Sequence, residues 1–307
     1  MSSVTVSQDT LAEEFREHRA HLLGVAYRLT GTLSDAEDAV QEAWLRLSTV
    51  DRNGIRDLRA WLTTVTGRLC LDRLRSAAVQ RERYVGSWLP EPVVTPLTPQ
   101  PTEDPLEVVV RDDGMRMAAL VVLDKLSPEQ RVAFVLHDAF SVPFEEIAET
   151  LGCATATARQ YASRGRKAVA DADPPPRASM EEQRSLVERF VAAVSSGDLR
   201  SVVELLHPDV ALVGDSNGKA RTTVNVITGR EKVARFLIGL MAKYKLGRVP
   251  GEPVLVNGDL GLYLPYTPAD EAHPEIARRV DGFAVRDGKI AGVYDVVNPD
   301  KLTRVPE

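Results

Sequence analysis

The stretch from Phe144 to Lys167 has the residue types that read nucleic acid, at a spacing that two short helices would provide. Apolar residues recur at positions 144, 147, 148 and 151, the spacing of one helix face, and Gly152 stands where a helix C-terminus often has glycine. A second helix is predicted over 156–169, with small residues on its inner face and these side chains outward: Thr157, Arg159, Gln160, Ser163, Arg164, Arg166 and Lys167. Arginine and glutamine can pair with base edges, and Thr, Ser and Lys can hold phosphates. The pattern predicts a DNA-reading helix-turn-helix.

The charge distribution bears on how such a protein would hold DNA. The 307-residue chain has a net charge of -6, whereas a protein that binds DNA unaided usually presents a basic surface. Basic residues concentrate in 156–169, which has four and no acidic residue, and in 67–83, which has five arginines. A few phosphate contacts opposed by an acidic remainder give weak binding, so a partner must bring the chain to DNA. A solvated basic helix on a bundle is the alternative interpretation.

Prolines divide the chain that must position these residues. Six of the 19 prolines lie between Pro90 and Pro105, and residues 174–176 are three consecutive prolines. The segments before the two proline-rich stretches have apolar residues at helical spacing, and alternating apolar patterns typical of strands occur after the second stretch. The expected domains are a helical segment (10–83), a proline-rich linker (84–105), a second helical segment (106–171) and an α+β domain (179–305).

The first segment offers an acidic helix and a basic one. Ser34 and Glu37 have the spacing of a capping box, which predicts that a helix starts there. A further helix is expected from residue 57 or 58 to beyond Leu74, and it ends in arginine-rich sequence. A Trp at its start, Trp61, suits a surface that stacks unpaired bases, although a lone Trp is more often part of a core.

The second and last segments have equally local signals. Ser127 and Gln130 form a second capping box with Pro128 at the first helical position. In the last segment, helices are expected over 180–195 and 198–206. Strands are then expected at 210–213, 253–256, 260–264, 282–285 and 290–296, with turns at Asn257-Gly258 and Asp287-Gly288. Helices followed by a curved antiparallel sheet make an α+β domain.

These strings resemble the extracytoplasmic-function sigma factors of bacteria, and more narrowly those with a SnoaL-like (NTF2-like) C-terminal extension. Residues 34–47 are similar to the region-2 helix that docks on core RNA polymerase, and residues 59–75 to the helix that engages and melts the -10 element. Residues 126–131 and the helix-turn-helix resemble region 4, which reads the -35 element. The resemblance implies a multidomain fold, with two all-α sigma domains, the second a helix-turn-helix, followed by an α+β NTF2-like cone with a curved antiparallel sheet.

The resemblance and the outward positions together assign roles to single residues. The -35 contacts are expected from Thr157, Arg159, Gln160, Ser163, Arg164 and Lys167. The -10 contacts are expected from Trp61, Arg68, Arg73 and Arg75. The polymerase contacts are expected from Asp35, Asp38, Gln41 and Glu42.

Two further strings match the extended subgroup, and a third corresponds to one of its signatures with two glycines replaced. They are Trp88-Leu-Pro-Glu-Pro92, Asn298-Pro-Asp-Lys-Leu302 and Asp215-Ser-Asn-Gly-Lys219, the last of which is usually Asp-Gly-Gly-Gly-Lys. Asn tolerates positive φ better than most residues, so Asn217 is a mild replacement. Because prolines stiffen the linker, we expect the Trp88 ring to dock on the C-terminal domain rather than cap the first helical domain. Interdomain regulatory contacts are expected from Trp88, Pro90, Glu91, Pro92, Asp215, Lys219, Asn298, Asp300, Lys301 and Leu302.

The leading prediction is a transcription initiation factor that binds core RNA polymerase, directs it to -35 and -10 promoter elements, and is modulated by its fused C-terminal domain. It is not an enzyme and needs neither cofactor nor metal. No apolar run is long enough for a membrane span and no leader is present, so the cytoplasm is the expected location. The subgroup resemblance implies no separate anti-sigma factor, and the cone could hold a small apolar ligand.

Two other classes stay open at this point. A SnoaL-like isomerase or cyclase fused to a DNA-binding module would use acid–base residues in the cone, with these candidates: His207, Asp209, Asp215, Tyr263 and Asp295. A ligand-responsive repressor that binds operators as a dimer is the third class. Its weakness is that a repressor needs neither a polymerase-docking helix nor a melting surface.

Overall fold

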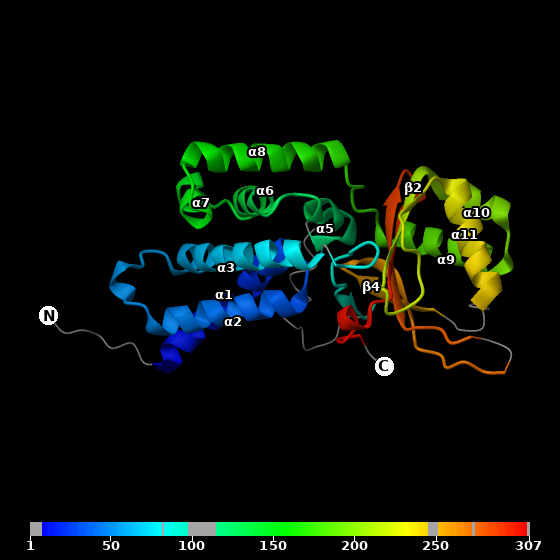
Figure 1. Cartoon of the computed structure of the whole chain (residues 1–307), viewed down its shortest axis with the longest axis horizontal. Helices are drawn as coiled ribbons and strands as arrows, with labels where there is room; N and C mark the ends of the chain where they lie inside the picture. The colour runs from blue at the N-terminus through cyan, green and yellow to red at the C-terminus, as the bar shows by residue number, and fades with distance from the viewer. Residues whose placement is uncertain (1–7, 82, 98–114, 245–250, 272–273, 306–307) are drawn as a thin grey trace. The chain divides into compact units, whose positions relative to one another are not determined.

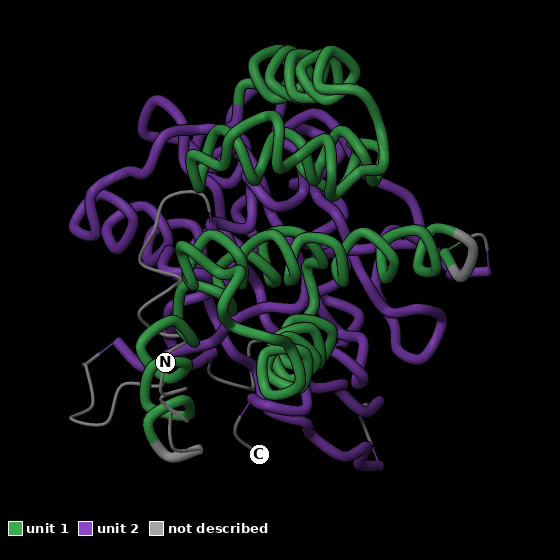
Figure 2. Tube along the Cα trace, turned by 90° about the vertical axis from the view of Figure 1, so that its left-hand side faces the viewer, with its two compact units in different colours: residues 1–82, 102–110, 122–173 green, residues 83–101, 111–121, 174–307 purple. Residues whose placement is uncertain are grey.

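The computed structural model describes residues 8–81, 83–97, 115–244, 251–271 and 274–305. The chain forms two compact units (Figure 2), which we call the helical unit (1–82, 102–110 and 122–173) and the sheet unit (83–101, 111–121 and 174–307). The first helical segment and residues 122–171 of the second thus share one unit, whereas residues 115–121 and residues 83–97 of the predicted linker belong to the sheet unit. The remainder of that linker, 98–105, lies outside the described residues. Within the described parts of the chain, no helix combines the length and apolarity that crossing a membrane requires.

The helical unit begins with three helices that pack on one another (Figure 1): α1 (Gln8–Thr30), α2 (Leu33–Thr49) and α3 (Leu58–Arg81). Their interface buries Leu22, Tyr27 and Leu62 completely. The capping box predicted at Ser34 is wrong, because α2 has its N-cap two residues earlier. Thr32 is the N-cap, and its hydroxyl donates a 2.6 Å hydrogen bond to the Asp35 carboxylate.

The second half of the helical unit is the predicted helix-turn-helix. It follows α5 (Met117–Asp124) and comprises α6 (Pro128–Phe134), a π-helical turn (Val135–Ala139), α7 (Phe144–Leu151) and α8 (Thr155–Ala172). The Ser127–Gln130 capping box is confirmed. Gly152 ends α7 in the left-handed conformation, with φ 65°, as its position predicts. The cap at Ser127 and the glycine at 152 are local features of the sequence, and Gly152 sets the turn that determines the direction of α8.

The described part of the sheet unit has three α-helices that follow residue 174 and a sheet of seven strands. The helices are α9 (Met180–Ser196), α10 (Leu199–Leu205) and α11 (Arg230–Tyr244). The strands are β1 (Val94–Thr95), β2 (Leu206–Asp215), β3 (Ile227–Thr228), β4 (Glu252–Val256), β5 (Asp259–Leu264), β6 (Arg279–Arg286) and β7 (Lys289–Val296). Their spatial order is β1-β4-β5-β6-β7-β2-β3. The α+β class is confirmed, and the two-residue turns at 257–258 and 287–288 have the positive φ at both positions that type I′ hairpins need.

The prediction of a purely antiparallel sheet is wrong in one pairing. Strands β2 and β7 run parallel, with Leu212 opposite Val293. The chain between them contains α11 and four strands, so no tight turn forces an antiparallel partner. Helix α11 was also not predicted from the sequence; its apolar residues pack on the same core as Phe190 and Phe283. The short strand β1 was missed as well, and it adds the linker to the sheet beside β4.

Candidate nucleic-acid interface, linker lock and cone cavity

Helix α8 presents a polar, cationic face. Its inner side chains Ala158, Ala162 and Gly165 are buried, and the helix approaches α6 so closely that a Cβ at Gly165 would lie 2.8 Å from the Phe134 Cβ. The predicted -35 residues Arg159, Gln160, Ser163, Arg164 and Lys167 are all exposed, whereas Thr157 is half-buried. The packing therefore turns arginine forks and an amide outward, the groups that pair with base edges.

Two arginines of α8 are held by acidic neighbours. Arg166 makes two hydrogen bonds to Asp138, of 2.8 and 2.9 Å, and Arg159 reaches Glu145 at 3.4 Å. Such exposed pairs contribute about 0–1 kcal/mol, so a phosphate or base can displace them. Within the described part of the chain, Arg164 makes no ion pair.

The predicted -10 residues lie on α3, and α7 and α6 bind two of them. Arg68 donates to the Glu149 carbonyl at 3.0 Å, and Arg75 donates two hydrogen bonds to Glu129, of 3.1 and 3.2 Å. Trp61 is half-buried. This face of α3 is consequently occupied by the helix-turn-helix half of the helical unit.

The acidic face of α2 splits into two parts. Asp38 and Gln41 are exposed, and Glu42 pairs with Arg46 one turn later at 3.4 Å. Asp35 is engaged instead by its cap hydrogen bond, and the predicted -10 residue Arg73 lies 3.9 Å from it. The exposed remainder of this face is the part available to a partner protein.

Arg131 is a buried residue to which the sequence assigned no role. Its guanidinium, only 3% exposed, donates to the carbonyls of Leu29 and Leu123, both at 2.8 Å, and to the Asp124 carboxylate at 2.9 Å. Burial lowers its pKa to about 10, partly offset by Asp124. Its place before an apolar run inside a helix was the available signal. Arg131 ties the end of α1 to the start of the helix-turn-helix.

In the sheet unit, the linker is bound by a cluster that we call the linker lock: Tyr84, Leu89, Asp215, Asn298 and Lys301. Asp215 is fully buried and accepts from the Leu89 amide at 2.7 Å, from the Lys301 ammonium at 2.6 Å and from the Tyr84 hydroxyl. Lys301 also donates to the Leu89 carbonyl, and Asn298 donates to the Tyr84 oxygen at 2.9 Å. Burial and the hydrogen bond to Asp215 raise the pKa of Tyr84.

The remaining linker motif packs around this lock. The Lys301 ammonium lies 4.1 Å from the centre of the Trp88 ring, within cation–π range. Pro90, Glu91 and Pro92 are buried, as is Leu302. Trp88 therefore contacts the C-terminal domain, the first of the two expected positions.

Two neighbouring features complete this arrangement. Asn257 is buried, accepts from the Val93 amide at 3.2 Å and donates to the Met115 carbonyl at 2.8 Å; the sequence showed it only as a turn residue. In the loop after Asp215, Asn217 has φ 48° and Gly218 has φ 71°. The expectation that Asn217 accommodates positive φ is confirmed. Lys219 pairs with Asp300 at the surface.

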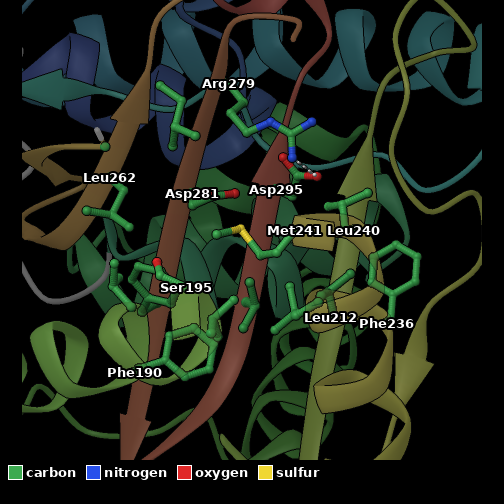
Figure 3. A pocket seen from close by; sticks show the side chains of 17 residues that line it. Phe190, Ser195, Leu212, Phe236, Leu240, Met241, Leu262, Arg279, Asp281 and Asp295 are labelled. Carbon is green, nitrogen blue, oxygen red and sulfur yellow. Dashed lines mark ion pairs between the residues drawn. The ribbon is translucent and has the colours of Figure 1, made fainter. Parts of the chain in front are cut away.

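The cone contains a cavity of about 200 Å³. Figure 3 shows Arg279, Asp281 and Asp295 gathered at one end, with Phe190 and Leu212 farther along it. Of the five acid–base candidates, only Asp295 lines this cavity. Among the described residues, no cluster of His, Cys, Asp and Glu side chains could hold a metal ion.

The carboxyl groups at the polar end are electrostatically coupled. Asp295 accepts from the Thr222 hydroxyl at 2.5 Å and lies 3.6 Å from an Arg279 nitrogen. Burial raises the pKa of Asp281 well above its ordinary value, and the nearby Asp295 raises it further, although Arg279 opposes this shift. Burial alone would lower the pKa of Arg279, but Asp295 and Asp281 raise it. At this end the carboxyl groups of Asp281 and Asp295 line the cavity beside the Arg279 guanidinium.

Comparisons with known proteins agree with this organisation. Residues 15–79 match the Sigma-70 region 2 family, residues 116–169 the Sigma-70 region 4 family, and residues 187–293 the SnoaL-like domain family. The chain is 52% identical to the ECF RNA polymerase sigma factor SigJ of Mycobacterium tuberculosis over 95% of this chain and 93% of that protein. It is 38% identical to the probable ECF RNA polymerase sigma factor SigI of the same species, over 66% of this chain and 69% of that protein.

A solved structure gives the same result. The crystal structure of Mycobacterium tuberculosis SigJ superposes with a TM-score of 0.80 at 50% identity, over 95% of this chain and 98% of that one. The predicted family and function are therefore confirmed. The chain belongs to the extracytoplasmic-function RNA polymerase sigma factors, as a transcription initiation factor with a fused SnoaL-like domain.

Proposed function

We propose that this sigma factor docks on core RNA polymerase through the exposed face of α2 and places the enzyme on promoters with two helices. Helix α8 reads the -35 element, and α3 engages the -10 element. The observation that carries the proposal is the face of α8, where Gln160, Arg164 and Lys167 are exposed together on a helix buried along its opposite side. Its work takes place in the cytoplasm, where the polymerase acts, without a separate anti-sigma factor.

The packing of α3 adds a conformational requirement. Arg68 and Arg75 bind the helix-turn-helix half of the helical unit, so they cannot hold a promoter strand in this arrangement. Engagement of both promoter elements requires α3 to separate from α6 and α7. The hydrogen bonds from Arg68 and Arg75 are exposed, and core polymerase and DNA can replace them, whereas the bond from Thr64 to Glu146, at 3.2 Å, is partly buried.

Run-off transcription with purified core polymerase and the full chain tests this assignment. We expect Arg164→Ala to lower initiation from a cognate promoter about tenfold or more, since a lost bidentate contact to guanine is worth about 1–3 kcal/mol. Arg189→Ala, which removes an exposed arginine from α9, is the matched control and should leave initiation unchanged. Full activity of the Arg164 variant on that promoter would contradict the assignment.

The fused domain, in this proposal, controls the factor through the linker. The linker lock and the pairing of β1 with β4 hold residues 84–95 on the sheet unit. The proposal includes a small apolar ligand in the cone, supported by the cavity and its apolar walls. A ligand would give the fused domain a signal to sense.

A further inference from the structure

The region-4 segment, from α5 to α8 (117–172), begins and ends at residues of the sheet unit. Residues 115–121 at its start and 174–178 after its end both belong to that unit. At the start, the Met115 carbonyl accepts a 2.8 Å hydrogen bond from Asn257, and Met117 packs in the same buried core as Val256. The beginning of α5 is therefore part of the packed structure of the sheet unit.

Asp259, the first residue of β5, joins the start of this segment to its end. Its carboxylate accepts a 2.7 Å hydrogen bond from the Arg116 Nε, and the Arg116 Nη1 donates to the Pro175 carbonyl at 2.6 Å. The Arg177 Nε lies 3.4 Å from the other carboxylate oxygen, and Gln183 donates to that oxygen at 3.3 Å. The side chains of Arg116 and Asp259 are only 5% and 7% exposed. One buried carboxylate thus binds residues on both sides of the region-4 segment.

Gln183 of α9 attaches the end of the segment a second time. Its amide nitrogen donates to the Ala178 carbonyl at 2.9 Å, and its amide oxygen accepts from the Leu260 amide at 2.6 Å. Gln183 is 3% exposed. The chain that follows α8 is consequently bonded both to Asp259 and, through Gln183, to the backbone of β5.

The chain that follows α3 is held on the same sheet by the linker lock. Roughly 20 residues lie between Thr95 and Met115, and an extended chain of that length spans up to about 70 Å. If this stretch alone joined region 4 to region 2, it would allow region 4 many positions. The lock and the contacts of Asp259 instead fix both connections of region 4, and the chain that leaves region 2, on one sheet.

We propose that Asp259 is a positioning residue for promoter selection, which restricts the factor to one spacing between the -35 and -10 elements by fixing both ends of the region-4 segment through Arg116. This inference rests on the proposed reading of those elements by α8 and α3. One additional base pair moves the -35 element about 3.4 Å along the duplex and about 35° around its axis. A segment attached at both ends resists that displacement. Separation of α3 from α6 and α7 leaves these attachments in place, because none of the bonds to Asp259 or Arg116 described above involves α3.

Run-off transcription with core polymerase and the full chain tests the proposal on promoters that share both elements and differ by one or two base pairs in the spacer. The measured quantity is the ratio of initiation at an altered spacer to initiation at the best spacer, taken within each variant, so that losses of folded protein or of polymerase binding cancel. We expect the wild-type ratio to be about a tenth or less, comparable to the effect of a mismatched base pair. Asp259→Asn keeps the shape of the side chain but removes the charge that both arginines contact, and it should raise the ratio about threefold or more.

A second variant and a control accompany this measurement. Arg116→Met removes the partner that links Asp259 to Pro175, and it should raise the ratio as Asp259→Asn does. Glu204→Gln removes a carboxylate from the exposed Arg200–Glu204 pair on α10 and should keep the wild-type ratio.

Amide hydrogen exchange on the same variants tests the attachment without DNA. In Asp259→Asn, peptides that cover 115–121 and 174–178 should lose about tenfold or more in protection, while β6 and β7 keep theirs. Unchanged protection of these peptides, or loss throughout the sheet, would overturn the assignment of Asp259 as a local attachment.

The transcription results separate this inference from the proposed function. Lost protection with an unchanged spacer ratio would overturn the positioning role, as would equal use of all spacers by the wild-type chain. Wild-type initiation that does not depend on the -35 sequence would instead contradict the proposed role of α8, and the exchange result would still decide whether Asp259 holds the two ends.

Discussion

Replacement of Lys301 by Met tests whether the linker lock holds the linker on the sheet unit. The ammonium bonds the Asp215 carboxylate and the Leu89 carbonyl, and both charged side chains are less than a tenth exposed. Methionine has similar length but no charge. Lys301→Met therefore leaves a buried carboxylate and a buried carbonyl without their strongest partner, and we expect the linker to detach.

The magnitude follows from the partners that remain. Removing one member of a buried ion pair typically costs about 3–5 kcal/mol. Asp215 would keep hydrogen bonds from the Leu89 amide and the Tyr84 hydroxyl, so the lower end applies. A cost of about 3 kcal/mol corresponds to an opening equilibrium that is about 100-fold more favourable.

Amide hydrogen exchange measures this opening segment by segment in the full chain. Peptides that cover residues 84–95 should lose about 100-fold in protection, while β5 and β6 keep theirs. Lys219→Met is the control, because the Lys219–Asp300 pair is exposed at 45% and 59%. An exposed pair contributes at most about 1 kcal/mol, so this variant should change protection by less than about fivefold.

Three results would contradict a local lock at Lys301. Unchanged protection of residues 84–95 in Lys301→Met would show that the buried ion pair does not hold the linker. Equal losses in the Lys301 and Lys219 variants would show that burial does not distinguish them. Loss of protection throughout the sheet would instead assign Lys301 to the stability of the whole domain, contrary to a local lock.

Two further predictions concern the helical unit. The His21 ring accepts a hydrogen bond from Arg59, and burial together with this cation lowers the pKa of His21 to about 4. The unfolded state therefore binds more protons than the folded state between pH 6.5 and 4, and the free energy of unfolding should fall by about 1–2 kcal/mol on acidification through that range, after allowance for the partial exposure of His21. Urea titrations of His21→Gln should lack this loss. Gly165→Ala should destabilise the unit by about 1–3 kcal/mol in thermal unfolding, because the new Cβ meets Phe134 at 2.8 Å, whereas Gly239→Ala, with open space around it, should be neutral or stabilising. Equal effects of the two alanines would contradict this account of helix packing.

The features that could be predicted from the sequence are those determined by residues a few positions apart in the chain. The capping box at Ser127 and the turn glycine Gly152 state their conformations within a few residues. The parallel pairing of β2 with β7, the strand β1 and the partners of Arg131 depend on residues far apart in the chain. Periodicity carries no information on such partners, because a buried cation and a solvated one look alike in sequence.

The partners of the linker lock and of the predicted -10 residues could likewise not be predicted from the sequence. The motif around Trp88 and the one around Lys301 were visible as separate strings, and their chemistry suggested polar contact. The sequence did not show that Tyr84, outside every motif, would bond the central carboxylate. Nor did it show that Arg68 and Arg75, which were predicted to contact the -10 element, would bind helices of the second sigma domain. An outward position on a helix predicts availability only until the neighbouring helix is known.

The lock and the cone cavity lie next to each other on two paired strands. Asp215 of β2 pairs with Val296 of β7, and the preceding pair joins Gly214 to Asp295. Thr222, at the end of the segment that follows Asp215, bonds the Asp295 carboxylate, and it lies so close to Gly214 that a Cβ there would be 2.3 Å from its hydroxyl. Only glycine permits this approach. A ligand that displaced Asp295 would thus act on the register partner of Gly214, the residue that precedes Asp215 in the chain.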